Sequence, residues 1–307
     1  MASDLRPLLH SLLPGAGTSL GTIHTLQQVT SRDDWKHLPG ELPMAAAVAS
    51  RALAETAEPP PTRLILVSSV PPHVPHMGAF TLAEAVGLAP GHVVDIGNHC
   101  AAMLDGLWLA MTLWKDEANL LVSATQLGEA VSETMRSTKP GSLQWGDGAA
   151  AVVLGGEGES RIRPLSYVTA TDPSLHRMLD VRPQAEGYKY EFREDVAERF
   201  QAADLDNELM VMGEAIEAAG VPATELAAIV VVNRGRRRTE LLGPAFGIDP
   251  KLVISSRTEI GHGGGADFLF NLDKLLTERG PGTHHVVVVG NGLGYCWSCL
   301  VVEIELA

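Results

Sequence analysis

Short aliphatic runs alternate with helix-forming segments along the whole chain, and this alternation restricts the fold more than any other feature. Such runs stand at 64–69, 93–96 and 120–124 in the first half, and at 229–232 and 286–289 in the second. A continuous apolar run of about four to eight residues is typical of a strand buried on both faces. Strands that alternate with helices form sheets covered by helices. We therefore predict an α/β protein.

The second half repeats the order of the first half. Helices are predicted at 43–56, at 79–86 and onward from residue 100, and again at 194–219 and 266–276. In both halves a buried strand leads through a glycine-rich turn to a final strand, which indicates an internal duplication. A glycine-rich linker lies between the halves. We therefore place the domain boundary near residue 157, with domains at 1–157 and 158–307.

The composition excludes several classes of protein. The 307 residues include 23 Lys and Arg against 37 Asp and Glu, a net charge of −14, so nucleic acid is not an expected partner. No apolar run reaches the about 18 residues of a transmembrane helix, and no basic segment followed by an apolar stretch opens the chain. The three cysteines do not form a disulfide framework. We expect a cytoplasmic protein without a membrane partner.

Cys100 stands at the start of a predicted helix, directly after a short strand and a Gly97-Asn98 turn. At that place it faces the positive end of the helix dipole and free backbone N–H groups. Both favour the thiolate, which is the nucleophilic form of cysteine. The alternative is a buried structural cysteine, since free cysteines are often buried.

Taken in order, the motifs resemble the thiolase superfamily, and most of all its β-ketoacyl synthase III (KAS III) branch. Residues 95–110, with Cys100, are similar to the nucleophile motif of that branch. Gly146-Asp147-Gly148-Ala149 matches its GDGA motif, and 292–294 with Trp297 resemble its C-terminal glycine-rich turn and tryptophan. The resemblance covers residues 40–307. It implies a thiolase-like five-layer α-β-α-β-α fold from two duplicated halves, a homodimer, and an acyl-thioester on Cys100.

The chain departs from that branch at several positions. It has Asn233 where the branch places a histidine and His262 where it places an asparagine, an arrangement similar to that of classical thiolases. The second catalytic cysteine of thiolases, expected near Val288, is absent. Thr125 stands where many relatives carry an acidic residue, and the N-terminal region is shorter than in the family.

The resemblance and the chemistry of the residues together suggest the roles in catalysis. His262 is the expected base, since histidine titrates near neutral pH; a purely structural turn histidine is the alternative. The Asn233 amide can donate to a thioester or enolate oxygen, or it can simply cap a turn. By resemblance, the backbone N–H groups of Cys100 and Leu293 form the oxyanion hole.

A basic cluster follows the strand that ends near residue 232. Such a cluster suits the phosphate of coenzyme A or of a carrier-protein phosphopantetheine arm, and an ordinary solvated helix face is the alternative. Cys296 and Cys299 lie in a predicted buried strand, which favours structural thiols over a metal site. We expect no metal and no bound cofactor. The cluster consists of Arg234, Arg236, Arg237 and Arg238.

These features predict an acyltransferase similar to β-ketoacyl synthase III. Cys100 would take an acyl group from acyl-CoA or an acyl carrier protein and pass it to a carbon, oxygen or nitrogen atom of a small-molecule acceptor. The exchanged histidine and asparagine favour specialised polyketide or secondary-metabolite biosynthesis. A catalytically silent partner subunit and a thioesterase-like hydrolase are the alternatives, although a silent subunit usually loses the nucleophile.

Overall fold

The computed structural model describes most of the chain. The described residues are 8–10, 17–26, 35–56, 59–68, 78–97, 100–125, 146–155, 160–176, 179–184, 187–292 and 296–307.

The first half forms a five-stranded sheet. Its inner strands β4 and β6 are parallel to each other, and β7 is antiparallel to β6. Strand β6 is buried along its whole length, as its aliphatic sequence predicts. In spatial order the strands are β3 (His24–Leu26), β7 (Gly148–Leu154), β6 (Asn119–Thr125), β4 (Arg63–Ser68) and β5 (His92–Ile96).

The second half forms a sheet of seven described strands, and strand β14 lies at its centre. Strand β14 pairs antiparallel with β13 on one side and with β8 on the other. Beside these sheets stands a two-stranded hairpin, β9 (Leu179–Gln184) and β10 (Gly187–Phe192). In spatial order the sheet contains β1 (Leu8–His10), β8 (Arg161–Thr171), β14 (Cys296–Leu306), β13 (Gly282–Gly292), β11 (Leu226–Val231) and β12 (Val253–Ile254), with β2 (Thr18–Ser19) also paired to β8.

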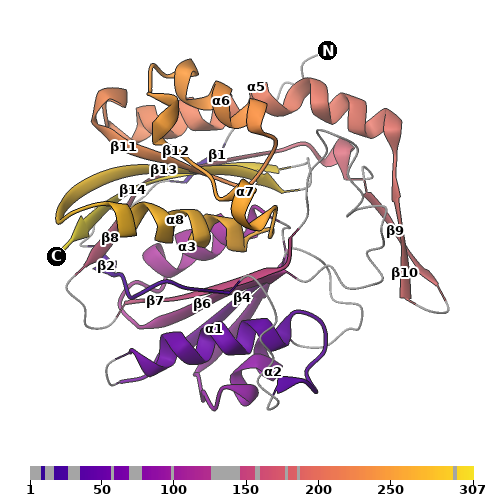
Figure 1. The fold of residues 1–307 in the computed structure, drawn as a ribbon, viewed down its shortest axis with the longest axis vertical. Helices are drawn as coiled ribbons and strands as arrows, with labels where there is room; N and C mark the ends of the chain where they lie inside the picture. Colours follow the sequence, from indigo (N-terminus) through magenta and orange to yellow (C-terminus); the bar gives the residue numbers. More distant parts are fainter. Residues whose placement is uncertain are drawn as a thin grey trace.

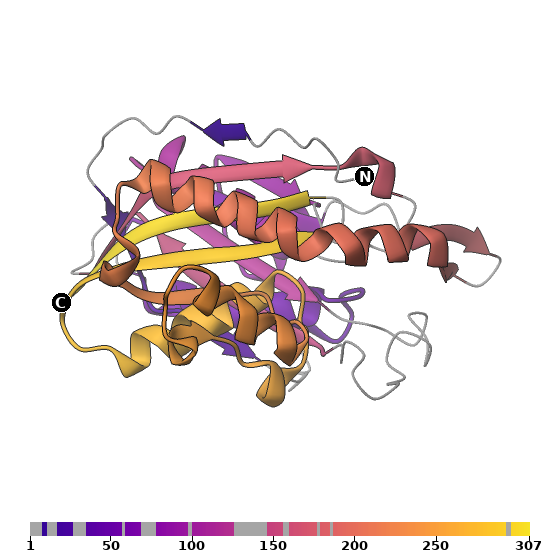
Figure 2. The ribbon, with the colours of Figure 1, turned by 90° about the horizontal axis from the view of Figure 1, so that it is seen from above.

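Helices and sheets stack in five layers (Figure 1), and the view from above shows a long helix of the outer layer lying across the second sheet (Figure 2). Helices α1 (Leu42–Ala54) and α2 (Gly78–Ala85) cover the outer face of the first sheet. Helices α3 (Ala102–Thr112) and α8 (Ala266–Glu278) lie between the two sheets and touch both. Helix α5 (Glu194–Ala219) covers the outer face of the second sheet. The predicted five-layer α-β-α-β-α arrangement is confirmed.

Short helices complete the described chain. They are α6 (Arg236–Ala245), α7 (Arg257–Ile260) and the 3₁₀ turns η2 (Pro173–Leu175), η3 (Ala223–Glu225) and η4 (Pro250–Leu252). Among the described segments, no helix has both the length and the apolar character that crossing a bilayer requires.

The predicted duplication matches the two sheets, but the early strands do not stay with the first half. Strands β1 and β2 pair with β8, so the beginning of the chain completes the edge of the second sheet. The boundary near residue 157 stays a prediction. It falls between β7, in the first sheet, and β8, in the second.

The GDGA motif holds the turn that carries His262. The Gly146 N–H donates to the His262 carbonyl oxygen over 2.9 Å. A Cβ at Gly146 would overlap the Ile260 carbonyl oxygen, so only glycine allows the two backbones to approach this closely. The motif therefore serves as a packing surface that connects the first sheet to the turn before α8.

We expect Gly146→Ala to destabilise the protein by about 1–3 kcal/mol, because the added methyl group must displace backbone atoms. Urea unfolding of the purified protein measures this change. Gly280→Ala is the matched control, since nothing lies within 4 Å of a Cβ at Gly280. Equal stability of the two variants would show that the close approach to Ile260 is not required.

Candidate active site

Cys100 lies at the N-terminal end of α3, as predicted. The helix begins at Ala102, and Cys100 is a free thiol with only 4% of its surface exposed. The partial positive charge of a helix N-terminus favours a negatively charged sulfur at this place. The position therefore fits a nucleophile.

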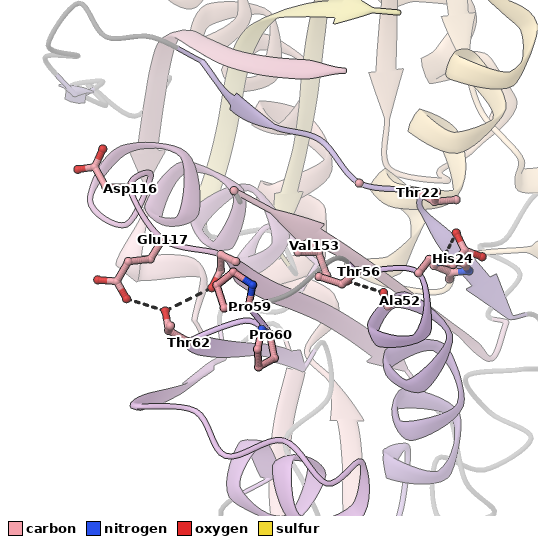
Figure 3. Close-up of a pocket in the computed structure, with 14 residues that line it drawn as sticks. Thr22, His24, Ala52, Thr56, Pro59, Pro60, Thr62, Asp116, Glu117 and Val153 are labelled. Atoms are coloured by element: carbon pink, nitrogen blue, oxygen red, sulfur yellow. Dashed lines mark hydrogen bonds and ion pairs between the residues drawn. The ribbon is translucent and has the colours of Figure 1, made fainter. Parts of the chain in front are cut away.

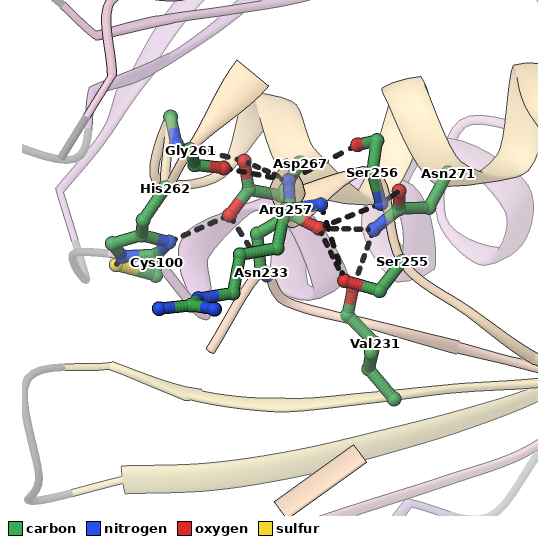
Figure 4. Close-up of polar contacts among 11 residues, drawn as sticks. Cys100, Val231, Asn233, Ser255, Ser256, Arg257, Gly261, His262, Asp267 and Asn271 are labelled. Atoms are coloured by element: carbon green, nitrogen blue, oxygen red, sulfur yellow. Dashed lines mark hydrogen bonds and ion pairs between the residues drawn. The ribbon is translucent and has the colours of Figure 1, made fainter. Parts of the chain in front are cut away.

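His262 meets Cys100 from the other half of the chain. Its Nε2 atom lies 3.1 Å from Cys100 Sγ, and its side chain is buried (Figure 4). The preceding Gly261 ends α7 with φ of 72°, a conformation that favours glycine. This sharp turn directs the imidazole towards the cysteine, so two residues that the sequence separates by 162 positions are in contact.

Asp267 completes the arrangement. It lies in the first turn of α8, is fully buried, and its Oδ2 atom is 2.6 Å from His262 Nδ1. Sequence reasoning missed this residue. The available signal is an acidic residue that opens a helix five positions after a histidine in a glycine-rich turn. One imidazole nitrogen therefore faces the sulfur and the other faces a carboxylate, the relation of nucleophile, base and orienting acid in a catalytic triad.

Cys100 and Asp267 together determine the charge of His262. Burial is the largest single influence on the pKa of His262, and it opposes the charged form. The negative charges of Cys100 and Asp267, with hydrogen bonds from both, outweigh it and raise the pKa of His262 from 6.5 to about 10. The imidazole is therefore held as an imidazolium at neutral pH.

Asn233 belongs to the same cluster, and its side chain is hydrogen-bonded to protein groups. Its side-chain amide donates to Ser256 Oγ, the Gly261 carbonyl oxygen and Asp267 Oδ1 over 2.9–3.1 Å, and its backbone N–H donates to Asp267 Oδ2 over 3.0 Å. The side chain is fully buried. With its amide hydrogens engaged, this geometry favours a positioning role over the predicted donation to a substrate oxygen, which stays a prediction.

Further polar groups hold Asn233 in place. Its Oδ1 atom accepts hydrogen bonds from Ser255 Oγ, the Ser256 backbone N–H and Asn271 Nδ2 over 2.9–3.1 Å. Asn271 in turn donates to the Val231 carbonyl oxygen over 2.6 Å. This network connects strand β11 to helices α7 and α8 (Figure 4). It fixes the orientation of the Asp267 carboxylate, because each member has a defined partner.

Arg234 forms an ion pair within the protein. Its guanidinium donates to Asp204 Oδ2 over 2.7 Å, and the other oxygen of that carboxylate accepts hydrogen bonds from Trp297 Nε1, over 2.8 Å, and from Asn291. The structure thus gives the arginine an internal counter-charge. The predicted phosphate contact of Arg234 stays a prediction, and its geometry favours a structural ion pair.

Other predicted site residues lie outside the described part of the chain. Leu293 of the predicted oxyanion hole is one of them. For Arg236, Arg237 and Arg238 the structure describes only the backbone, as the first turn of α6. Their predicted roles remain predictions.

Cys296 and Cys299 are free, buried thiols on β14, where a strand was predicted. Burial, followed by the nearby charge of Glu208, raises the pKa of Cys299 well above its usual range. The neutral thiol is therefore the stable form of Cys299, which fits its predicted structural role.

A cavity of about 330 Å³ opens at the end of the first sheet where strands β4 and β6 begin, opposite to the end near Cys100 (Figure 3). It is lined by residues that precede strands β4 and β6, such as Thr62 and Ala118, whereas Cys100 follows the far end of β5. Since the cavity contains none of the predicted site residues, it is separate from the candidate active site.

Comparison with known proteins agrees with the predicted likeness. A family model for 3-oxoacyl-[acyl-carrier-protein] synthase III matches residues 94–173, which include Cys100 and the GDGA motif. No curated protein matches the sequence significantly.

Solved structures match almost the whole chain. The synthase III FabH of Pseudomonas aeruginosa has a TM-score of 0.75 at 19% identity over 94% of this chain and 98% of its own. ChlB3, described as an acyltransferase, has a TM-score of 0.74 at 21% identity over 94% of this chain and 98% of its own. OleA of Xanthomonas campestris has a TM-score of 0.74 at 17% identity over 95% of this chain and 99% of its own. The thiolase-like fold and the likeness to β-ketoacyl synthase III are thus confirmed.

We expect the His262 imidazole to titrate with a midpoint near pH 10, and NMR of histidine-labelled protein measures it. Asp267→Asn and Cys100→Ala should each lower the midpoint, because each removes a charge that favours the imidazolium. Since the pKa in the folded state lies above the unfolded value of about 6.5, the stabilisation is complete below about pH 6.5, declines as the pH rises, and is gone above about pH 10. A wild-type midpoint below 7 would contradict this arrangement.

Proposed function

We propose that the protein is an acyltransferase that works through an acyl-thioester on Cys100. The contact of Cys100 Sγ with His262 Nε2, backed by the contact of His262 Nδ1 with Asp267, carries the proposal. A cysteine next to a charged histidine is an activated nucleophile for a thioester carbonyl. The likeness to synthase III, and to ChlB3 as an acyltransferase, supports the same reaction class.

In the first half-reaction the Cys100 thiolate attacks the carbonyl carbon of an acyl-thioester. The bond from that carbon to the leaving sulfur breaks, and the leaving thiolate takes the proton of the His262 imidazolium. The backbone N–H of Cys100, with that of Leu293, is proposed to stabilise the oxyanion. The products are an acyl-enzyme, a free thiol and a neutral His262.

Acylation also prepares the second half-reaction. The negative charge of Cys100 is one of the influences that raise the pKa of His262, and forming the thioester removes that charge. The histidine therefore becomes easier to deprotonate and can accept a proton from the acceptor as the acceptor attacks the acyl carbonyl. Asp267 remains beside Nδ1 and stabilises the imidazolium that forms.

Among the acceptors, a hydroxyl or amine fits the geometry best. Such an acceptor needs a general base, which the pair of His262 and Asp267 supplies. A carbanion acceptor needs donors for an enolate oxygen, and the amide of Asn233 is engaged with protein partners. We therefore favour ester or amide formation over carbon–carbon bond formation.

The donor is proposed to be acyl-CoA or an acyl carrier protein, without any bound cofactor. The proposal includes the specialised, polyketide-type biosynthetic setting, which is supported by the exchanged positions of Asn233 and His262 and by the ester- or amide-forming geometry. Soluble, cytoplasmic partners are expected for such a reaction.

We expect a mass gain equal to the acyl group when the wild-type protein is incubated with a panel of acyl-CoA and acyl-carrier-protein donors. Intact-protein mass spectrometry measures the gain. Cys100→Ala should show none, because the nucleophile is absent. Asp267→Asn should be acylated at least about 100-fold more slowly, a lower bound, since the same change in a serine-protease triad lowers kcat by about 10⁴-fold.

Adding hydroxyl or amine acceptors to the acylated enzyme then tests transfer. Loss of the adduct with formation of an ester or amide is the expected result. Release of free acid without an acceptor would identify a hydrolase instead. No adduct with any donor would refute the proposal and favour a catalytically silent partner subunit.

A homodimer is also part of the proposal. Strand β5 is the outer edge of the first sheet, and its aliphatic residues Val93, Val94 and Ile96 are only partly buried. Phe80 on the adjacent α2 is 57% exposed. An edge strand that pairs on only one side among the described strands, with apolar neighbours, is suited to pairing with a second copy.

We expect light scattering to give twice the chain mass of 32.6 kDa. Phe80→Ser should weaken this dimer by about tenfold or more in Kd, because it removes an exposed aromatic group from the interface. Leu241→Ser on α6, an exposed apolar residue of the opposite outer layer, is the control and should remain dimeric. A monomeric wild-type protein would refute the dimer alone.

A further inference from the structure

Thr125 has a buried hydroxyl that nothing in the described structure uses. It is the last residue of β6, its side chain is 1% exposed, and Oγ1 has no hydrogen-bond partner among the described residues. An unpaired buried hydroxyl is costly, so native proteins seldom keep one without a reason.

The hydroxyl faces the central layer that contains the triad. Side chains alternate along a strand, so Thr125 shares a face with Leu121 and Ser123. Leu121 packs in the same core as Cys100, whereas the intervening Leu120, Val122 and Ala124 pack under α1.

Thr125 also lies at the same level of the sheet as Cys100. A Cβ on Gly265 would be 3.0 Å from Ser123 Oγ and 3.4 Å from Met103 Cβ, so Ser123 and Met103 are at one level. Helix α3 connects two parallel strands and runs opposite to them. Thr125 is two residues after Ser123, which places it about 6.6 Å further towards the C-terminal end of β6. Cys100 is three residues before Met103, and because α3 runs opposite to β6 this places Cys100 about 4.5 Å in the same direction.

The neighbouring strand places His262 at this level too. Thr125 is paired with Gly148 on β7. A Cβ on Gly263 would lie 3.9 Å from the Gly148 Cα atom, and Gly263 directly follows His262. The hydroxyl therefore lies on the side of the first sheet, at about the level of the contact of Cys100 with His262.

We propose that the Thr125 hydroxyl binds an oxygen of the acyl group held on Cys100, so that the site selects acyl groups with an oxo or hydroxyl substituent close to the thioester carbonyl. This inference rests on the proposed function. A hydroxyl donates to an oxo group and accepts from a hydroxyl group, so both are recognised. A plain alkanoyl group would leave the buried hydroxyl unpaired, which disfavours it.

The test compares three donors of equal chain length: butyryl-CoA, 3-hydroxybutyryl-CoA and acetoacetyl-CoA. Mass spectrometry measures the rate of acylation of Cys100 by each. We expect the wild type to prefer the two oxygenated donors about tenfold over butyryl-CoA, the order of one neutral hydrogen bond. Thr125→Val, which keeps the shape, should abolish the preference, and Thr125→Ser should retain it.

A second readout does not depend on activity. In the free protein, Thr125→Val should raise the melting temperature, because a methyl group replaces an unpaired buried hydroxyl. Ser123→Ala is the matched control on the same strand face. The Ser123 hydroxyl donates to the Val67 carbonyl oxygen over 3.3 Å, so its loss should lower the melting temperature and leave the donor preference unchanged.

The outcomes separate the two proposals. Acylation of wild type and Thr125→Val with the same donor preference would overturn the role of Thr125 while the acyltransferase stands. A lowered melting temperature of Thr125→Val would overturn it as well, since the hydroxyl would then have a protein partner. Failure of these three donors while other donors of the wider panel acylate Cys100 would overturn the role of Thr125 alone, and failure of the whole acyl-CoA and acyl-carrier-protein panel would overturn both proposals.

Discussion

The Asp267 carboxylate is the interaction on which the candidate site depends. Its two oxygens accept hydrogen bonds from the His262 imidazole, from the backbone N–H groups of Gly263 and Asn233, and from the Asn233 side-chain amide. A buried carboxylate is tolerated only with such partners and an opposing charge. The same group joins strand β11, the glycine-rich turn and helix α8. The hydrogen bonds that stabilise the charge of the triad therefore also hold these three elements together.

The α/β class was predictable because hydrophobic patterning determines it, whereas the five-layer arrangement was predicted from the resemblance to the thiolase superfamily. Aliphatic runs located β4, β5, β6, β11 and β13, and helix α5 was predicted with the bounds that it has. The pairing of β1 and β2 with β8 could not be predicted, since it depends on contacts across about half the chain and on segments with little pattern of their own. Local sequence specifies elements better than it specifies distant partners.

The candidate site was predicted in part. Cys100 was singled out by a local feature, its place at a helix start, whereas His262 was predicted from the resemblance to the thiolase superfamily together with its glycine-rich turn. Asp267 was missed, because an acidic residue in a first helical turn is common and signals chemistry only when a histidine is seen against it. The hydrogen-bond partners of the Asn233 side chain could not be predicted from the sequence either. Whether an amide faces substrate or protein depends on Ser256, Gly261 and Asp267, which meet it only in three dimensions.

The central place of β14 has a consequence for synthesis of the protein. This strand is the last in sequence order, yet it is the middle of the second sheet and the partner of both β8 and β13. During translation β8 has no neighbour at its inner side until the final strand leaves the ribosome, whereas all strands of the first sheet are complete by Leu154. The sheet of the half that carries Cys100 can therefore be assembled before β14 is made, whereas the sheet of the half that carries His262 is joined only once β14 has been synthesised.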